Sequence, residues 1–369
     1  MSEISFGSKL NLKQAAQLIM AVPENRVLVL GEMGTGKSAM LDYFAAHSSM
    51  SDYLIADPID AQTLDLGDTA MPVVDKERMV TNYAPNSRFK ISEAIAANRP
   101  VLIMIDEFGK AMAPVQNMLH PLLEVRARLG DLYLPGLWSG ASADSIIFAT
   151  SNLSGEGVGD NFKMHTNNRS TRIEVAKPTA DEWIEWGVMT GKIDPVVLAW
   201  AAAYPQAFAS FTDEGQNENP YIGNPRHVQF SFFSPRSGER ASNIVRKRHL
   251  FDEATLVAAL KGTIGEAAAR DMQAYIAYQD QMPKWVDIIN DPKHTMVPDS
   301  PGACSVLIFG AIQKVDSKSI DPFMDYMERF EPEWQAAFAI NVAKNSAKQA
   351  VAFSSKKFAD WLLQNEDLL

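Results

Sequence analysis

The chain has 369 residues, of which 46% are hydrophobic and 21% charged. These are ordinary proportions for a folded protein and exclude global disorder, and the length predicts one large domain with appendages or two domains. A surplus of acidic residues, 45 against 34 basic ones, leaves a net charge of -11, which disfavours nucleic acid and anionic membranes as partners.

Short apolar runs alternate with helical spacing over the first half of the chain. Residues 26–30 read RVLVL and are followed at once by glycines, and a helical pattern begins after Ser38. Similar apolar runs follow at 53–56, 101–105, 145–149 and 172–175. Continuous apolar runs of this length are typical of buried parallel strands. Their alternation with helices predicts a three-layer α/β/α core around a largely parallel sheet.

Helical spacing replaces the strand pattern after Pro178. Asp194 is a suitable cap for one helix, Ser234 precedes another, and a further one is expected to begin at Asp321. Residues 282–302 are rich in Asp, Pro and Lys and look like a linker. We therefore divide the chain into an α/β core (1–177), an all-α region (178–280) and a helical C-terminal extension (281–369).

The sequence gives no support for a disulfide or zinc site, or for a secretory signal or a membrane span. The single cysteine, Cys304, cannot form an internal disulfide, and no second thiol or clustered histidines accompany it to make a zinc site, so we expect it to be buried. The first residues contain no apolar stretch behind a basic head, and the longest apolar-rich stretch, 196–211, is interrupted by Pro205. We expect a cytoplasmic protein without a membrane span.

The strongest motif is the P-loop, residues 31–38, which reads GEMGTGKS between a predicted strand and a predicted helix. Glycines allow successive backbone N–H groups to surround phosphate oxygens. Lys37 would neutralise the β- and γ-phosphates of ATP, and the Ser38 hydroxyl would ligate Mg²⁺. The predicted nucleotide-binding residues are Gly31, Glu32, Met33, Gly34, Thr35, Gly36, Lys37, Ser38 and Ala39.

Two later strands end in polar residues that complete an ATPase site. Residues 101–107 read VLIMIDE, so that Asp106 can hold Mg²⁺ while Glu107 orients and activates the attacking water. Residues 146–152 read IIFATSN, which would place Asn152 beside the γ-phosphate to position that water. The sequence thus predicts ATP hydrolysis with Mg²⁺.

The set of motifs resembles the AAA+ ATPases, most closely their MoxR-like branch (dynein-related, AAA_5 type). The motifs that carry the resemblance, in chain order, are GEMGTGKS, LDLGD (64–68), LIMIDE, FATSN, NNRSTRIEV (167–175), DEWIEWG (181–187) and SPRSGERAS (234–242). The resemblance covers nearly the whole chain and is strongest over residues 27–245. It implies a homo-oligomeric ring, usually a hexamer, with ATP bound between subunits.

Further site residues and partners follow from this resemblance. Arg169 looks like the arginine finger that acts on the neighbouring subunit's ATP, with Arg172 as the competing candidate, and Arg236 corresponds to the sensor-2 arginine of a helical lid. The family implies remodelling, activation or assembly of a protein client, and relatives frequently work with a von Willebrand factor A domain partner. A nucleic-acid-stimulated motor or restriction-type translocase is the alternative, against which the net charge weighs.

Two further segments of the core lie between the predicted strands. Residues 64–90 resemble the helix-2 insert of that branch, and we expect a solvated loop there. The resemblance also implies that projecting loops of this kind contact clients. The insert contains Met71, Tyr83 and the basic residues Lys76, Arg78, Arg88 and Lys90. Residues 130–138 predict a hairpin, in which Tyr133 and Trp138 either face the pore of the ring or close a small core; we favour the core.

Overall fold

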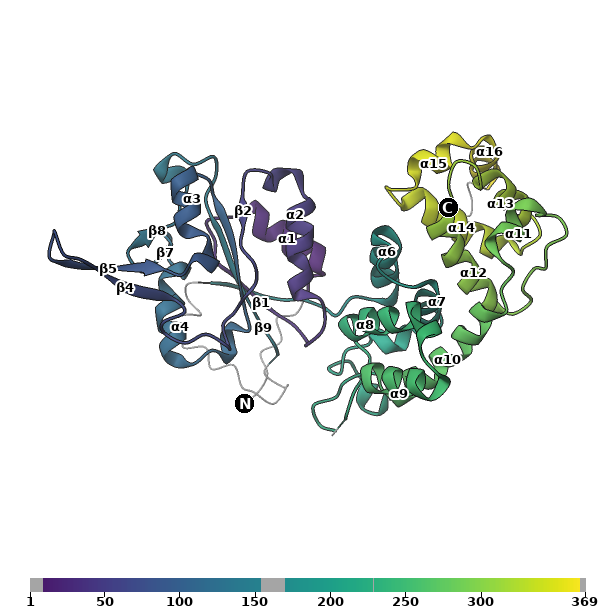
Figure 1. The fold of residues 1–369 in the computed structure, drawn as a ribbon, viewed down its shortest axis with the longest axis horizontal. Coiled ribbons are helices and arrows are strands. Elements are labelled where there is room, and N and C mark those ends of the chain that lie inside the picture. The colour runs from purple at the N-terminus through teal and green to yellow at the C-terminus, as the bar shows by residue number, and fades with distance from the viewer. Residues whose placement is uncertain (1–8, 154–169, 228, 366–369) are drawn as a thin grey trace. The chain divides into compact units, whose positions relative to one another are not determined.

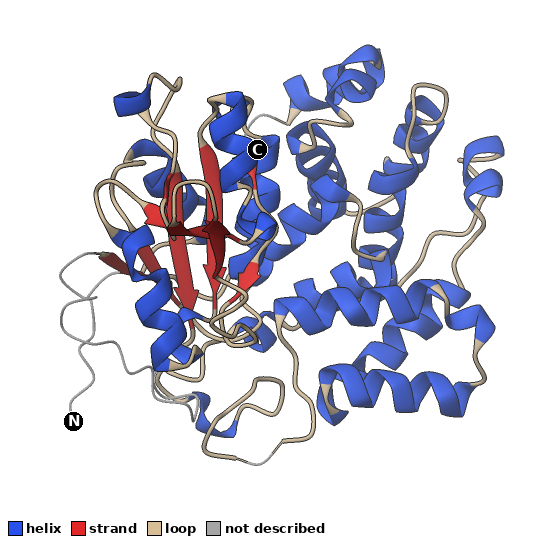
Figure 2. Cartoon of the chain, turned by 60° about the vertical axis from the view of Figure 1, so that its left-hand side comes forward, coloured by secondary structure: helices blue, strands red, loops and turns tan. Residues whose placement is uncertain are grey.

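The computed structural model describes residues 9–153, 170–227 and 229–365. The chain divides into two compact units, Met1–Lys177 and Pro178–Leu369 (Figure 1). The first unit contains a parallel sheet with helices on both faces, and the second is built from helices (Figure 2). The predicted fold class, an α/β core followed by an all-α region, is confirmed.

Every predicted strand is present in one parallel sheet, in the order β10-β1-β9-β6-β2, and a short sixth strand, β3, also pairs with β6. The strands are β1 (Val27–Leu30), β2 (Leu54–Ile55), β3 (Ile59–Asp60), β6 (Val101–Asp106), β9 (Ile146–Ser151) and β10 (Thr171–Glu174). All residues of β1 and β9 are buried, as continuous apolar runs require.

The sheet lies between two hydrophobic cores because successive strand residues point to opposite faces. In β6, Val101, Ile103 and Ile105 belong to one core, and Leu102 and Met104 belong to the other. Helices cover both faces. The first core includes α3 (Ile91–Ala97) and α4 (Ala113–Leu119), and the second includes α1 (Leu12–Ala21) and α2 (Met40–Ala46). Helix α4 ends shortly before Pro121, and the chain continues in the 3-10 turn His120–Leu123.

The segment between β3 and α3 forms an antiparallel hairpin, so the expectation of a solvated loop was wrong. Strands β4 (Ala70–Asp75) and β5 (Val80–Pro85) extend away from the rest of the first unit (Figure 1). Met71 and Tyr83 are both exposed. Since apolar residues stand on both exposed faces of this hairpin, the sequence shows no alternation between apolar and polar positions that would have predicted strands.

A second hairpin pairs β7 (Arg128–Leu129) with β8 (Leu132–Tyr133); it begins two residues before the predicted segment and ends five residues before the end of that segment. Gly130 forms its turn with a φ of 58°. The rings of Tyr133 and Trp138 contact each other edge to face, with centroids 6.1 Å apart. Both side chains are about half exposed, so the prediction that they close a small core was wrong.

The second unit has one continuous hydrophobic core that runs from Ala180 to Phe358. Helix α7 is buried on nearly all sides and packs against α12, which explains its uniformly apolar sequence. The helices are α6 (Ala180–Thr190), α7 (Pro195–Ala203), α8 (Pro235–Arg246), α9 (Glu253–Ile264), α10 (Glu266–Asp280), α11 (Trp285–Asn290), α12 (Pro301–Lys314), α13 (Ile320–Met327), α14 (Pro332–Lys344), α15 (Gln349–Ser354) and α16 (Lys356–Gln364).

The segment 282–302 is packed rather than a linker, which corrects the sequence prediction. It contains α11, whose Ile288 is buried in the core of the second unit. The Tyr326 hydroxyl donates a hydrogen bond to the Met296 carbonyl at 2.6 Å, and the Arg329 guanidinium donates to the Thr295 carbonyl at 2.6 Å. Cys304 is buried in α12, as expected. Among the described residues, no helix combines the length and apolar character needed to cross a bilayer.

Asp194 caps α7 from a buried position, which gives a prediction about stability. Its carboxylate accepts the Val196 N–H at 3.0 Å, and burial raises the pKa of its carboxyl group above the ordinary value. The raised pKa means that ionisation of Asp194 lowers the free energy of unfolding as pH rises. Asp194→Asn keeps the cap without the charge, so its free energy of unfolding should match or exceed that of the original chain at pH 7.

Thermal unfolding measured at several pH values checks this prediction. The advantage of Asp194→Asn over the original chain should grow as pH rises, because only the original side chain ionises. Asp194→Ala is the matched control, since it removes the cap as well and should lose about 1 kcal/mol. An asparagine variant as unstable as the alanine variant at pH 7 would contradict the argument.

Candidate functional site

The P-loop connects β1 to the 3-10 turn Lys37–Ala39 and α2, as its sequence predicts. Gly34 and Gly36 have φ angles of 74° and 97°, a region that side chains with a Cβ rarely adopt. Among the described residues, none accepts a hydrogen bond from the backbone N–H of Gly34 or Gly36. A loop that presents unpaired N–H groups next to the start of a helix favours the binding of an anion.

Gly31 is required by close packing rather than by its φ angle. A Cβ atom at this position would lie 2.6 Å from Cγ2 of Val175, which follows β10. Its N–H donates to the Ser151 carbonyl at 3.3 Å, which attaches the start of the loop to the end of β9. The loop is therefore fixed to the carboxyl edge of the sheet before its phosphate-binding part begins.

Lys37 lies inside the loop with its side chain 6% exposed. Its Nζ donates to the carbonyls of Gly31 at 2.7 Å and Glu32 at 2.9 Å, and to Oδ1 of Asn152 at 2.9 Å. A buried ammonium group requires such acceptors, because desolvation without partners is costly. The structure thus joins Lys37 and Asn152, two residues 115 positions apart.

Asp106 faces the first turn after the P-loop. Its Oδ2 accepts from the Ser38 hydroxyl at 3.3 Å, and its Oδ1 accepts from the Thr150 hydroxyl and from the Glu107 N–H at 3.2 Å. Thr150 was missed by the sequence analysis. The signal was available, because Thr150 stands two residues before Asn152 on β9, and residues at that spacing share a face of the sheet.

Glu107 stands directly after β6 with a φ of 52°, a left-handed conformation that is uncommon for a residue other than glycine. Asn152 Nδ2 lies 3.1 Å from its Oε1 and 3.3 Å from its Oε2, and Lys110 Nζ forms an ion pair with Oε2 at 2.9 Å. Strained backbone at a polar cluster points to function. Lys110 was also missed, because a lysine three residues after a carboxylate has no distinctive sequence pattern.

The residues of this site fit a nucleoside triphosphate bound together with Mg²⁺. A hydroxyl and a carboxylate, from Ser38 and Asp106, meet within hydrogen-bond distance, and oxygen ligands of this kind are those that Mg²⁺ prefers. The N–H groups of the loop and the Lys37 ammonium provide positive potential for phosphates. In this arrangement Ser38 and Asp106 would hold the metal, and the P-loop would hold the phosphates.

The structure describes two of the three predicted arginines, Arg172 and Arg236. Arg169 lies outside the described residues, and Arg172 is on β10, opposite Leu28 in the sheet register. Arg236 is the second residue of α8 in the second unit. Met33 is exposed at the loop tip, whereas Glu32 and Thr35 are buried, and the Thr35 hydroxyl donates to the Glu32 carbonyl at 3.0 Å.

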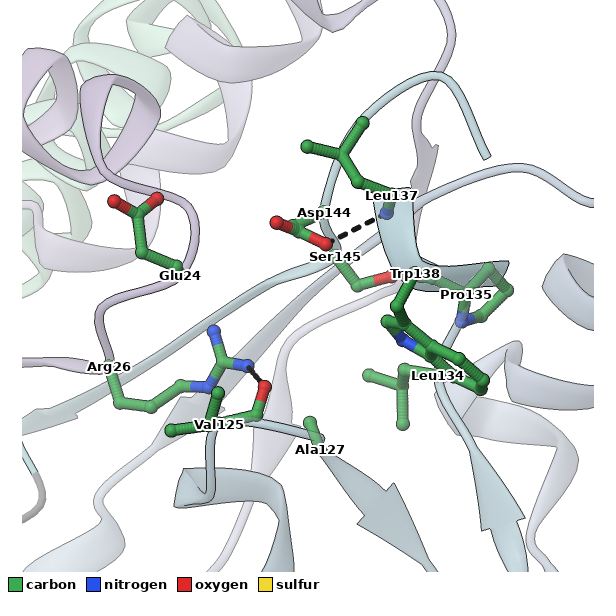
Figure 3. Close-up of a pocket in the computed structure, with 10 residues that line it drawn as sticks. All are labelled: Glu24, Arg26, Val125, Ala127, Leu134, Pro135, Leu137, Trp138, Asp144 and Ser145. Carbon is green, nitrogen blue, oxygen red and sulfur yellow. Dashed lines mark hydrogen bonds between the residues drawn. The ribbon is translucent and has the colours of Figure 1, made fainter. Parts of the chain in front are cut away.

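A separate cavity of about 180 Å³ lies at the opposite, amino edge of the sheet (Figure 3). Arg26, just before β1, projects into this region, and its Nη2 donates to the Val125 carbonyl at 3.4 Å. Burial lowers the pKa of Arg26 to about 10. None of the residues predicted to bind nucleotide lines this cavity, whose walls are Glu24, Arg26, Val125, Ala127, Leu134, Pro135, Leu137, Trp138, Asp144 and Ser145.

No protein-family model and no curated protein matches the chain. Among solved structures, NtrX from Brucella abortus in complex with ADP is 12% identical, over 97% of this chain and 67% of that one, with a TM-score of 0.38. A RuvB mutant from Thermotoga maritima is 13% identical, over 80% of each chain, with a TM-score of 0.36. Scores of this size carry no argument of their own, and the fold assignment rests on the chain's sheet and P-loop.

The contact between Thr150 and Asp106 gives a prediction about metal-dependent binding. Thr150→Val keeps the shape of this fully buried side chain but removes the hydroxyl that orients the carboxylate. Loss of such a supporting contact typically lowers metal affinity by roughly tenfold or more. We expect Mg²⁺-dependent ATP binding to weaken by about that factor, measured by titration with a fluorescent ATP analogue at several Mg²⁺ concentrations.

Thr150→Ser is the control for this titration, because it retains the hydroxyl. It should bind like the original chain. An equal loss of affinity for Thr150→Val with and without Mg²⁺ would show that the valine disturbs the P-loop rather than the metal ligand.

Proposed function

We propose that this chain is an AAA+ ATPase of the MoxR-like type, which hydrolyses ATP in a homo-oligomeric ring to remodel, activate or assemble a protein client. The observation that carries the proposal is the cluster at the carboxyl edge of the sheet. There Lys37 of the P-loop contacts Asn152, and the Asn152 amide contacts the Glu107 carboxylate. Beside them Ser38 contacts Asp106, and this pair could ligate Mg²⁺.

Each residue of the cluster has a role in this proposal. Lys37 binds the β- and γ-phosphates, and Ser38 and Asp106 ligate Mg²⁺, which would offset phosphate charge. Glu107 and Asn152 orient a water molecule. Glu107 accepts a proton from that water as its oxygen attacks the γ-phosphorus, and the bond from phosphorus to the β,γ-bridging oxygen breaks. The products are ADP and inorganic phosphate.

The remaining assignments rest on the motif resemblance. We place Arg169 or Arg172 as the finger that reaches the ATP of a neighbouring subunit, and Arg236 as the arginine with which residues 178–280 respond to nucleotide. A planar guanidinium suits charge that develops on the transferred phosphoryl group. The acidic net charge favours a protein client over nucleic acid, and a von Willebrand factor A domain protein is the proposed partner.

Two variants separate ATP binding from ATP hydrolysis. Lys37→Ala should abolish binding, because it removes the ammonium that faces the phosphates. Glu107→Gln should retain binding and lower kcat by roughly a hundredfold or more, as expected for loss of a general base. Equilibrium ATP binding and phosphate release measure the two effects. A Glu107→Gln variant with unchanged turnover would contradict the assigned role of Glu107.

Mixing inactive variants tests the ring and the finger. Arg169→Ala should be inactive alone but partly active when mixed with Glu107→Gln subunits, because a mixed interface then combines an intact Glu107 with an intact Arg169. The same experiment with Arg172→Ala distinguishes the two arginines. Phosphate release is the measurement, and no recovery with either variant would argue against a finger supplied by a neighbouring subunit.

A further inference from the structure

The cavity at the amino edge of the sheet contains a buried cation whose hydrogen bonds are incomplete (Figure 3). Arg26 is 5% exposed. Its Nη1 donates to the Pro23 carbonyl at 2.7 Å, and its Nη2 donates to the Glu124 and Val125 carbonyls at 3.2 and 3.4 Å. The N–H of Nε and the second N–H of Nη1 have no acceptor among the described residues. Buried donors are rarely left unpaired, so this guanidinium points to a missing partner.

Asp144 faces Arg26 across the cavity (Figure 3). Its Oδ1 accepts the Leu137 N–H at 2.9 Å, whereas none of the described residues donates to its Oδ2. The carboxylate opposes the fall in the pKa of Arg26 that burial causes, but the two groups form no ion pair. The other carboxylate of the cavity, that of Glu24, points away from Arg26 (Figure 3). A group between Arg26 and Asp144 could therefore accept from one and donate to the other.

The remaining walls of the cavity are mainly apolar. They are formed by Val125, Ala127, Leu134, Pro135, Leu137 and Trp138, together with Ser145. The Ser145 hydroxyl is already engaged, because it donates to the Pro135 carbonyl and accepts the Val101 N–H. An apolar cavity of about 150 Å³ is large enough for one benzene molecule. At about 180 Å³, this cavity has room for one aromatic ring with a hydroxyl group.

Exposed side chains surround the mouth of the cavity. Val125, Leu137 and Trp138 line it and are 88%, 64% and 51% exposed. The Arg126 guanidinium lies over the Trp138 ring, 5.6 Å from its centroid. Aromatic and arginine side chains next to a pocket are typical of the residues that dominate binding at protein interfaces. A free small molecule in the cavity would leave this rim uncovered, so the surface is better suited to a ring that belongs to a protein chain.

A second hollow adjoins the cavity. It has a volume of about 700 Å³, shares Val125 with the cavity and extends to Arg128 and Tyr133. Its charge is mixed, because Glu24 and Glu124 also line it. The hollow offers a surface for the residues on either side of an inserted ring, and its mixed charge favours neutral neighbours over a run of one sign.

We propose that this cavity binds the side chain of a tyrosine that belongs to a partner protein, with the ring between the apolar walls and the hydroxyl between Arg26 and Asp144. The hydroxyl donates to Asp144 and accepts from Arg26, so that both charges gain a partner. Neighbouring residues of the partner lie on the exposed rim. The site is at the edge of the sheet opposite the candidate nucleotide site, so the inference does not depend on the proposed ATP hydrolysis.

Titrations of the full chain with small probes test the inference, with binding followed by ligand-observed NMR. The probes are the peptides acetyl-Leu-Tyr-Leu-amide and acetyl-Leu-Phe-Leu-amide, and the free phenol p-cresol. The tyrosine peptide should bind roughly tenfold more tightly than the phenylalanine peptide, because only its hydroxyl pairs with the two charges. It should also bind roughly tenfold more tightly than p-cresol, because its leucines cover the apolar rim.

Asp144→Asn separates the hydroxyl contact from a general disturbance of the cavity. It keeps an acceptor for the Leu137 N–H but removes the charge. The tyrosine peptide should therefore bind about fivefold less tightly, while the phenylalanine peptide binds as before. Asp131→Asn is the matched control, because the Asp131 carboxylate also accepts a backbone N–H, that of Tyr83 at 2.6 Å, and does not line the cavity. It should change neither affinity.

Each contrary result overturns a stated part of the inference. Equal affinities of the two peptides, or an equal loss of both in Asp144→Asn, would overturn the hydroxyl contact with Arg26 and Asp144. Binding of p-cresol as tight as that of the tyrosine peptide would overturn the assignment to a protein partner. If no probe bound, the cavity would not be a site for such a ring.

Discussion

The parallel register of β1, β9 and β6 is the constraint on which the candidate site depends. Leu30 lies opposite Ser151, and Ile105 lies opposite Ala149, so these strands end at the same level. The residues that follow them are therefore neighbours, although they are far apart in sequence. Because apolar side chains are buried on both faces, a shift of register by one residue would exchange the two cores and would be strongly disfavoured.

The same edge collects charges that a folded protein does not normally bury. Lys37 is buried, and Asp106 and Glu107 are partly buried; each accepts or donates a hydrogen bond or ion pair with a neighbouring side chain. Burial of charges in this way is seldom a source of stability, because desolvation opposes the attraction between them. Neighbours such as Thr150 and Asn152 limit that cost, and the cluster is better explained by chemistry than by folding.

Much of this site was predictable from the sequence, because strand ends are marked by the change from apolar to polar residues. That change located Asp106, Glu107 and Asn152, and the glycines located the loop. Lys110 was not predictable, since its contact depends on the left-handed backbone at Glu107 and the turn after it. The β4–β5 hairpin was missed because neither of its faces is buried, so the sequence lacks the alternation on which strand prediction depends.

Predictions from residue composition were wrong at two places where local contacts determine the structure. The residues 282–302 have the composition of a linker, yet carbonyl groups in that segment accept hydrogen bonds from Tyr326 and Arg329, which attach it to the helical core. Tyr133 and Trp138 are aromatic residues of the kind usually buried, yet both are about half exposed, and their rings contact each other edge to face. A hairpin of two-residue strands has too little surface to cover both rings.

The segment that begins at Glu107 also connects the candidate site to the projecting hairpin. Gln116 on α4 donates to the Ala111 carbonyl at 3.0 Å, which ties that helix to the turn containing Lys110. Past α4 the chain reaches the β7–β8 hairpin, where the Asp131 N–H donates to the Tyr83 carbonyl at 3.0 Å. A Cβ at Gly130 would lie 2.2 Å from that carbonyl oxygen, so the two hairpins meet in close backbone contact. The segment from Glu107 to Asp131 therefore runs from the candidate site to a hydrogen bond with β5, one strand of the exposed hairpin.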